Sequence, residues 1–176
     1  MKRLFAAILT GLSMSSPAPA SGNPVINNHI QLVNAVKSTG TTYLVNPNEC
    51  DDTIGYGWYV AKSAVYRELV ICQENKVEGS TAMVEWTRED LDTLRHEAHH
   101  LVQDCMDNSL NSKLNNVYKT PVRLALDVMG DDKVSRIVKV YEDLSDHMIV
   151  MELEAFAVAA MNNPLDQVDD IKNYCF

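Results

Sequence analysis

Residues 87–106 read Thr-Arg-Glu-Asp-Leu-Asp-Thr-Leu-Arg-His-Glu-Ala-His-His-Leu-Val-Gln-Asp-Cys-Met. Thr87 with the acids that follow it is typical of a helix start, because a hydroxyl caps free backbone N–H groups and acids are favoured near the positive end of the helix dipole. Behind this cap, apolar residues recur every three or four positions. The segment therefore predicts one long helix with a buried face, made of Leu91, Leu94, Ala98, Leu101, Val102 and Cys105.

The same helix carries the pattern His-Glu-x-x-His at His96, Glu97 and His100. Helical residues four apart lie one above the other, about 6 Å along the axis, so both imidazoles can reach one zinc ion at about 2.0 to 2.1 Å. Glu97 is then placed to act as general base toward a water on the metal. The pattern predicts a single catalytic zinc and hydrolysis of peptide bonds. His99 faces about 100° away from His100, which favours a partly exposed residue or one behind the ligands.

A catalytic zinc needs a third protein ligand, and the helix itself does not supply one. The metzincin pattern requires Gly and His where Gln103 and Met106 stand, so that class is excluded. Asp104 lies eight residues after His96, about 12 Å along the helix, and is too far away to share the ion. The ligand must come from another segment.

The best donor is the apolar helix predicted over residues 145–161, which contains Glu152 and Glu154. A carboxylate in so apolar a helix is costly to bury unless it is paired or binds a metal. The two side chains point about 200° apart, so one can face the zinc while the other faces solvent or a cation. Spacing alone leaves both assignments open.

Together, residues 96–100 and the later segment Glu-Ala-Phe-Ala-Val-Ala at 154–159 resemble the gluzincin zinc metallopeptidases. The likeness is to compact members such as the lethal factor protease domain and the MtfA peptidases, and it covers under a third of the chain. It implies a zincin-like fold with Glu154 as third ligand, ahead of Glu152. Gluzincins often carry an acid one turn after this ligand, where this chain has Val158.

A hydrogen-bond donor for the developing oxyanion is also implied by the resemblance. In the lethal factor type a tyrosine two turns before the ligand glutamate has this role, and the equivalent position here is His147. An imidazole N–H can polarise an oxyanion much as a tyrosine does. Tyr141 and Tyr118 are weaker substitutes, and a helix-start histidine near Asp143 and Asp146 is the plain alternative for His147.

The rest of the chain indicates one α+β domain over residues 21–176, a zincin-like unit with a small antiparallel sheet before the two site helices. The expected strands are 42–45, a hairpin or small meander within 54–74 that includes a buried strand at 69–72, and a short strand at 82–86. Other expected helices span 26–37, 121–129 and 132–141. In such enzymes a strand beside the zinc helix pairs with extended substrate, for which 82–86 and 69–72 are candidates.

Residues 1–20 have the pattern of a cleaved signal peptide: a basic start, an apolar run too short to span a membrane, and Ala18-Pro19-Ala20 at the cleavage site. We therefore expect a secreted or periplasmic protein with no stable membrane insertion after cleavage. An even number of cysteines in an exported chain favours disulfides. From their order along the chain we expect Cys50 to pair with Cys72 and Cys105 with Cys175.

The net charge of −9 argues against nucleic acid as a partner, because an acidic protein repels phosphate backbones. A peptide or protein substrate is expected instead. The competing hypothesis is a non-catalytic zinc-binding or partner-binding protein with a degenerate zincin fold. Glu97 favours the enzyme, since hydrolysis requires this carboxylate and metal binding does not.

Overall fold

The computed structural model describes residues 24–51, 56–63, 65–106, 113–161 and 163–176. The predicted signal peptide lies outside these residues. The described chain forms six α-helices, one short 3₁₀ helix and a three-stranded sheet, so the α+β class is confirmed. The elements are α1 (Pro24–Ser38), β1 (Thr42–Val45), η1 (Asn48–Cys50), β2 (Gly57–Ser63), β3 (Tyr66–Ile71), α2 (Arg88–Cys105), α3 (Pro121–Met129), α4 (Asp131–Val140), α5 (Asp146–Met161) and α6 (Pro164–Tyr174).

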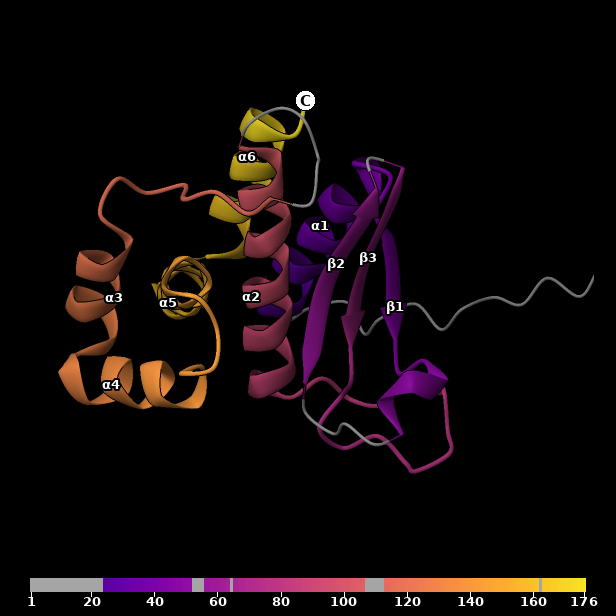
Figure 1. Ribbon diagram of the computed structural model, residues 1–176. Helices are drawn as coiled ribbons and strands as arrows, with labels where there is room; N and C mark the ends of the chain where they lie inside the picture. The colour runs from indigo at the N-terminus through magenta and orange to yellow at the C-terminus, as the bar shows by residue number, and fades with distance from the viewer. Residues whose placement is uncertain (1–23, 52–55, 64, 107–112, 162) are drawn as a thin grey trace, which may run out of the picture.

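Helix α2 stands in the middle of the molecule, with the sheet on one side and α3, α4 and α5 on the other (Figure 1). Its buried residues, among them Leu94, Ala98 and Leu101, join Leu69 and Ile71 of β3 in the main hydrophobic core. Helices α1 and α6 pack on each other and complete this core with Leu32, Val36 and Ile171. A second cluster joins α3, α4 and α5 through Ala125, Val134, Ile137, Leu153 and Ala157.

The sheet has the strand order β1-β3-β2 and is mixed, not antiparallel as expected. Strands β2 and β3 form the expected antiparallel hairpin, whereas β1 lies parallel to β3 with Tyr43 opposite Leu69. Strand β3 is central: β2 pairs with one of its sides and β1 with the other. Because β2 lies between β1 and β3 in the sequence and runs opposite to β3, strands β1 and β3 point in the same direction.

The expected strand at 82–86 is wrong, because this segment has no backbone ladder. Side-chain amides hold it instead. Gln73 accepts from the Val84 N–H at 2.8 Å and donates to the Val84 carbonyl at 3.0 Å, while Asn46 donates to the Ala82 carbonyl at 2.9 Å. The side-chain amide of buried Gln73 thus makes the two hydrogen bonds with Val84 that the backbone of a neighbouring strand would otherwise make.

Helix α6 was not predicted, although its start signal is present in the chain. Asn163 accepts from the Leu165 N–H at 3.2 Å, and Pro164 follows at the first helical position. An asparagine cap followed by proline favours a helix start as strongly as it marks the end of the preceding helix.

Both expected disulfides are confirmed. Strands β1 and β3 are parallel neighbours, so their C-terminal ends lie side by side. Cys50 and Cys72 follow these two ends. Cys105 ends α2 and its partner Cys175 follows α6. These bonds fit an oxidising compartment. In the described part of the chain, no helix is long and apolar enough to cross a membrane.

The predicted cap of α2 is present as a complete capping box. The Thr87 hydroxyl accepts from the Asp90 N–H at 3.1 Å, and the Asp90 carboxylate accepts from the Thr87 N–H at 2.9 Å. The other oxygen of Asp90 accepts from the Glu74 N–H at 2.8 Å, which ties the helix start to the segment after β3.

We expect Asp90→Ala to lower the free energy of unfolding by about 2 to 4 kcal/mol, because it removes a cap and leaves the Glu74 N–H without its partner. Thr87→Ala, which removes the cap alone, should cost about 1 kcal/mol. Urea unfolding of both variants checks this. The exposed neighbour Glu89 supplies the control, and an equal loss for Glu89→Ala and Asp90→Ala would contradict the assignment.

Candidate metal centre

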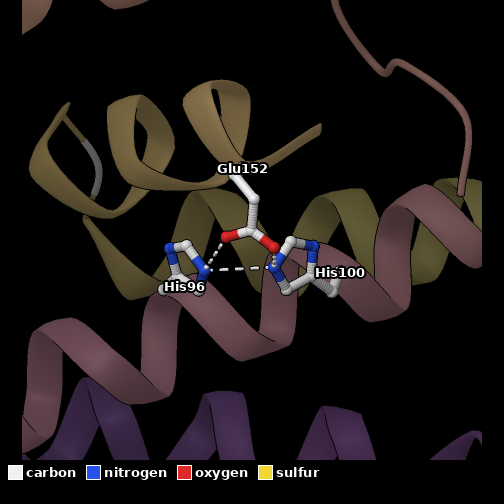
Figure 2. Close-up of side chains that lie close together, drawn as sticks. All are labelled: His96, His100 and Glu152. Atoms are coloured by element: carbon white, nitrogen blue, oxygen red, sulfur yellow. Dashed lines mark hydrogen bonds and ion pairs between the residues drawn. The ribbon is translucent and has the colours of Figure 1, made fainter. Parts of the chain in front are cut away.

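Both histidines of the His-Glu-x-x-His pattern point from α2 toward a carboxylate on α5, and that carboxylate belongs to Glu152 (Figure 2). The Nε2 atoms of His96 and His100 are 3.0 Å apart. They lie 3.2 Å and 3.5 Å from the two carboxylate oxygens of Glu152. All three side chains are largely buried, with 12% of the Glu152 side chain exposed. The structure thus brings together a His-His-Glu group that could hold a metal ion.

The three distances match those between ligands of a single metal ion. Two ligand atoms about 2.0 to 2.1 Å from a tetrahedral zinc lie about 3.3 Å apart, close to the spacings found here. Two imidazole N–H groups cannot face each other at 3.0 Å, so one of the two Nε2 atoms must offer its lone pair. Two imidazole nitrogens and a carboxylate oxygen are a typical catalytic zinc set.

Glu154, the ligand implied by the resemblance, does not join the two histidines. It is fully buried on a different side of α5, where His99 donates to it at 2.9 Å and the Gln103 amide at 3.2 Å. The backbone N–H groups of Val117 and Tyr118 add bonds of 3.0 and 3.1 Å. Its carboxylate is therefore satisfied without a metal, and Glu152 occupies the ligand position that spacing had left open.

The expectation that the second carboxylate faces solvent or a cation is wrong for a geometric reason. His99 and His100 point about 100° apart on α2, so α2 offers polar partners over a wide arc. Residues 113–120 run alongside and cover the remaining side of Glu154 with backbone donors. Glu152 contacts His96 and His100, and Glu154 contacts His99. His99 is fully buried rather than partly exposed.

His147 lies away from the metal group. Its Nε2 atom donates to the Leu114 carbonyl at 2.9 Å, and its side chain lines a separate cavity with Tyr59 and Met148. His147 shares a helical face with Glu154, whereas the carboxylate that meets His96 and His100 belongs to Glu152. The oxyanion role inferred for His147 therefore has no support from its position.

A cavity of about 350 Å³ opens beside the metal group and contains the general base expected from the sequence. Its lining includes Glu97, His96, Tyr141 and Phe156. Burial, together with the nearby carboxylates of Glu152 and Glu97, raises the pKa of the Tyr141 hydroxyl to about 12. Tyr141, a substitute in the sequence analysis, is the tyrosine that reaches the site and keeps its proton at neutral pH.

The sheet approaches this cavity through Gly57, the first residue of β2. A Cβ atom at this position would lie 2.8 Å from the Val70 carbonyl oxygen, 2.8 Å from Cγ2 of Thr93 and 3.0 Å from Cγ of Glu97. Only a residue without a side chain lets β2 lie this close to the helix at Glu97. The glycine thereby positions the edge of the sheet against the candidate base.

Charge inside the group follows from the same contacts. Burial alone would raise the pKa of Glu152, but hydrogen bonds and charge interactions with His100 and His96 outweigh it and hold that pKa well below its usual range. Burial likewise opposes protonation of His100, yet Glu152 and Glu97 raise the pKa of this imidazole to about 9. In the absence of a metal, a proton on His100 holds the cluster together.

No family model, curated protein or solved structure matches this chain significantly. The resemblance to gluzincins therefore rests on the sequence motifs alone.

Three parts of the site were not reached from the sequence. Helical spacing leaves Glu152 and Glu154 equally possible as the ligand. The resemblance favours His147 over Tyr141, and the sequence patterns give Gln103 no role beyond its departure from the metzincin motif. Gln103 carried a usable signal, because it lies three residues after His100 on the same helix face. Helix α5 is apolar on nearly all sides, so its sequence pattern does not predict which side faces the metal group.

Gly57→Ala should weaken packing between β2 and α2 and displace Glu97, since its Cβ would lie too close to backbone and side-chain atoms. We expect a loss of about 1 to 3 kcal/mol in the free energy of unfolding. Chemical denaturation measures this. The control is Gly79→Ala, where a Cβ meets nothing within 4 Å and only the positive φ of 69° adds strain. A Gly57→Ala variant as stable as the wild-type protein would refute the close-approach argument.

Metal binding should release a proton at neutral pH, because a protonated imidazole has no lone pair to give and the pKa of His100 is raised to about 9. The apparent affinity for zinc should fall about tenfold for each pH unit below that value. Calorimetry at pH 7 in buffers of different ionisation enthalpy counts the released protons. Binding with no proton release would contradict the charge state inferred for His100.

Proposed function

We propose that this protein is a zinc-dependent metallopeptidase, exported from the cytoplasm, with His96, His100 and Glu152 as metal ligands and Glu97 as general base. The observation that carries the proposal is the convergence of three ligand atoms beside a cavity that also contains Glu97. A purely structural zinc site is typically closed by four protein ligands. Here three ligands and an adjacent cavity leave room for a water molecule and a substrate carbonyl.

A zinc ion in this group would supply Lewis-acid chemistry, lowering the pKa of a water molecule toward neutrality and polarising a carbonyl oxygen. Glu97 then takes a proton from the attacking water and can pass it to the amine of the leaving product. Tyr141 holds its phenolic proton at neutral pH and lines the same cavity, so its O–H is suited to donate to the developing oxyanion.

The sheet favours an extended peptide as the substrate. In the order β1-β3-β2, strand β2 lies at an edge, and Tyr56 and Gly57 at its start line the cavity with Glu97. An exposed edge can bind an extended chain through backbone hydrogen bonds. The candidate strand at 69–72 lies largely within central β3, with neighbours on both sides, and residues 82–86 form no strand. We therefore move the proposed substrate-binding role to β2.

Export is proposed from the signal-like residues 1–20 and is supported by the two disulfides. The acidic net charge continues to favour a peptide or protein partner over nucleic acid. An exported zinc peptidase whose fold is held by disulfides combines these features without conflict.

The decisive comparison is between Glu97→Gln and Glu152→Gln. Glu97→Gln should keep about one zinc per chain and lose roughly 10²- to 10⁴-fold in hydrolysis rate, because the base is lost and the ligands remain. Glu152→Gln should lose most of the metal, because an amide is a poor replacement for a carboxylate ligand. Metal analysis and cleavage of a peptide library by each purified protein provide the two readouts.

Hydrolysis that survives in Glu97→Gln, or zinc content that is unchanged in Glu152→Gln, would overturn the respective assignment. If the wild-type protein binds zinc tightly but cleaves no peptide, the competing hypothesis of a non-catalytic zinc-binding protein is favoured. If Glu154→Gln rather than Glu152→Gln strips the metal, the ligand implied by the resemblance is restored.

A further inference from the structure

Behind His100 lies a buried polar chain that does not itself reach the cavity. The Nδ1 atom of His100 is 2.7 Å from Oε1 of Gln103. The amide nitrogen of Gln103 is 3.1 Å from the Met151 carbonyl oxygen and 3.2 Å from Oε1 of Glu154. Gln103 and Glu154 are fully buried, so these contacts have no competition from solvent.

The partners of Gln103 determine which way its amide points. The Met151 carbonyl and the Glu154 carboxylate are both acceptors, so the group that faces them must be the NH₂. The amide oxygen is then directed at His100 and can only accept, which places a proton on Nδ1 of that ring. In the neutral ring, which is the form that binds a metal, the lone pair is then left on Nε2, the atom that converges with His96 and Glu152.

Glu154 is suited to hold this arrangement because every group around it donates. The N–H groups of Val117 and Tyr118, the His99 ring and the Gln103 amide converge on its two oxygens. Four donors can satisfy a buried carboxylate, and any other orientation of the Glu154 side chain would break some of these hydrogen bonds. The charge of Glu154 therefore fixes the amide of Gln103 from behind.

His96 has no comparable support. Its Nδ1 atom is buried and has no hydrogen-bond partner in the described part of the chain. The tautomer of His96 is thus not set by a protein acceptor, whereas that of His100 is. Control over the geometry of the two histidines is concentrated at His100.

We propose that Gln103 selects Nε2 as the metal-coordinating nitrogen of His100, and that Glu154 is a positioning residue that holds Gln103 in the required orientation. This inference rests on the proposed function in one respect, since it presupposes a metal at the His-His-Glu group. It assigns to Glu154 a role different from the ligand role implied by the resemblance, and it supplies the support for a histidine ligand that Val158 does not provide.

The test uses the full-length exported protein labelled with ¹⁵N-histidine and loaded with ¹¹³Cd²⁺ as the probe. In the wild-type protein, cadmium–nitrogen coupling should appear on Nε2 of His100, and Nδ1 should carry a proton. Gln103→Met preserves the length of the side chain and removes both the acceptor and the donor. It should weaken cadmium and zinc binding roughly 10- to 100-fold, the usual effect of losing a partner behind a ligand. Its His100 signal should also no longer show a single protonated Nδ1.

The chain offers a matched control in Gln73, which is equally buried and also makes three side-chain hydrogen bonds, to Asn46 and Val84. Gln73→Met should destabilise the fold but leave metal affinity within about threefold of wild type, because it contacts no part of the metal group. Gln103→Glu tests the acceptor separately: with a proton on the carboxyl oxygen that faces Met151 and Glu154, its other oxygen can still accept from Nδ1. It should keep the Nε2 coupling that Gln103→Met loses, and it stands in if Gln103→Met does not fold.

Equal weakening by Gln103→Met and Gln73→Met would show a general structural effect and overturn the inference. So would an unchanged Nε2 coupling in Gln103→Met, or its loss in Gln103→Glu. Glu154→Gln should weaken binding less than Glu152→Gln and broaden the His100 signal; complete loss of metal there would make Glu154 a ligand. A wild-type protein that binds neither metal refutes the metal centre itself, whereas tight binding that is indifferent to Gln103 refutes only the positioning role.

Discussion

Two carboxylates on one apolar helix must both find partners, and this constraint governs how α5 packs on α2. A buried, unpaired carboxylate costs several kcal/mol, more than a typical apolar contact contributes. Glu152 meets His96 and His100, and Glu154, two residues later on α5, meets His99 and Gln103. Because both pairs form between the same two helices, the rotation and the height of α5 on α2 are set together.

The two glutamates differ in what surrounds them. Glu154 is closed off by donors, including backbone N–H groups of residues 113–120, and is fully buried. Glu152 remains 12% exposed and shares its oxygens with two imidazoles, one of which, His96, lines the cavity together with Tyr141. A carboxylate with saturated hydrogen bonds stabilises structure, whereas one that meets two imidazoles next to a cavity is suited to holding a metal ion. This contrast is the physical basis for assigning them different roles.

The rest of the fold holds α2 in position, although the helix carries several buried polar side chains. The capping box and the Glu74 contact fix its first turn, and the Cys105–Cys175 bond fixes its last residue to the end of α6. Gly57 allows the edge strand β2 to lie against Glu97. A helix held at both ends and along its length can keep three polar side chains in position without a large domain around it.

Much of this follows from the sequence because it depends on local geometry. The spacing of His96 and His100, the cap at Thr87, the strand at 42–45 and the helix at 121–129 are set by residues within a turn or two of each other. The predicted pairing of the four cysteines is also confirmed, although the bonds span 22 and 70 residues and depend on the pairing of β1 with β3 and the packing of α6 on α2.

What only the tertiary structure decided is which side of α5 faces α2. That helix is apolar on nearly all sides, so its pattern marks no buried face, and residues two apart were equally eligible. The rotation of α5 determines that Glu152 rather than Glu154 meets the two histidines. It also determines that Tyr141 rather than His147 lies at the cavity. The mixed sheet and the amide-held segment 82–86 depend in the same way on contacts between distant residues. Local rules place side chains on an element, but the rotation of one element against another is settled by packing and by the pairing of buried charge.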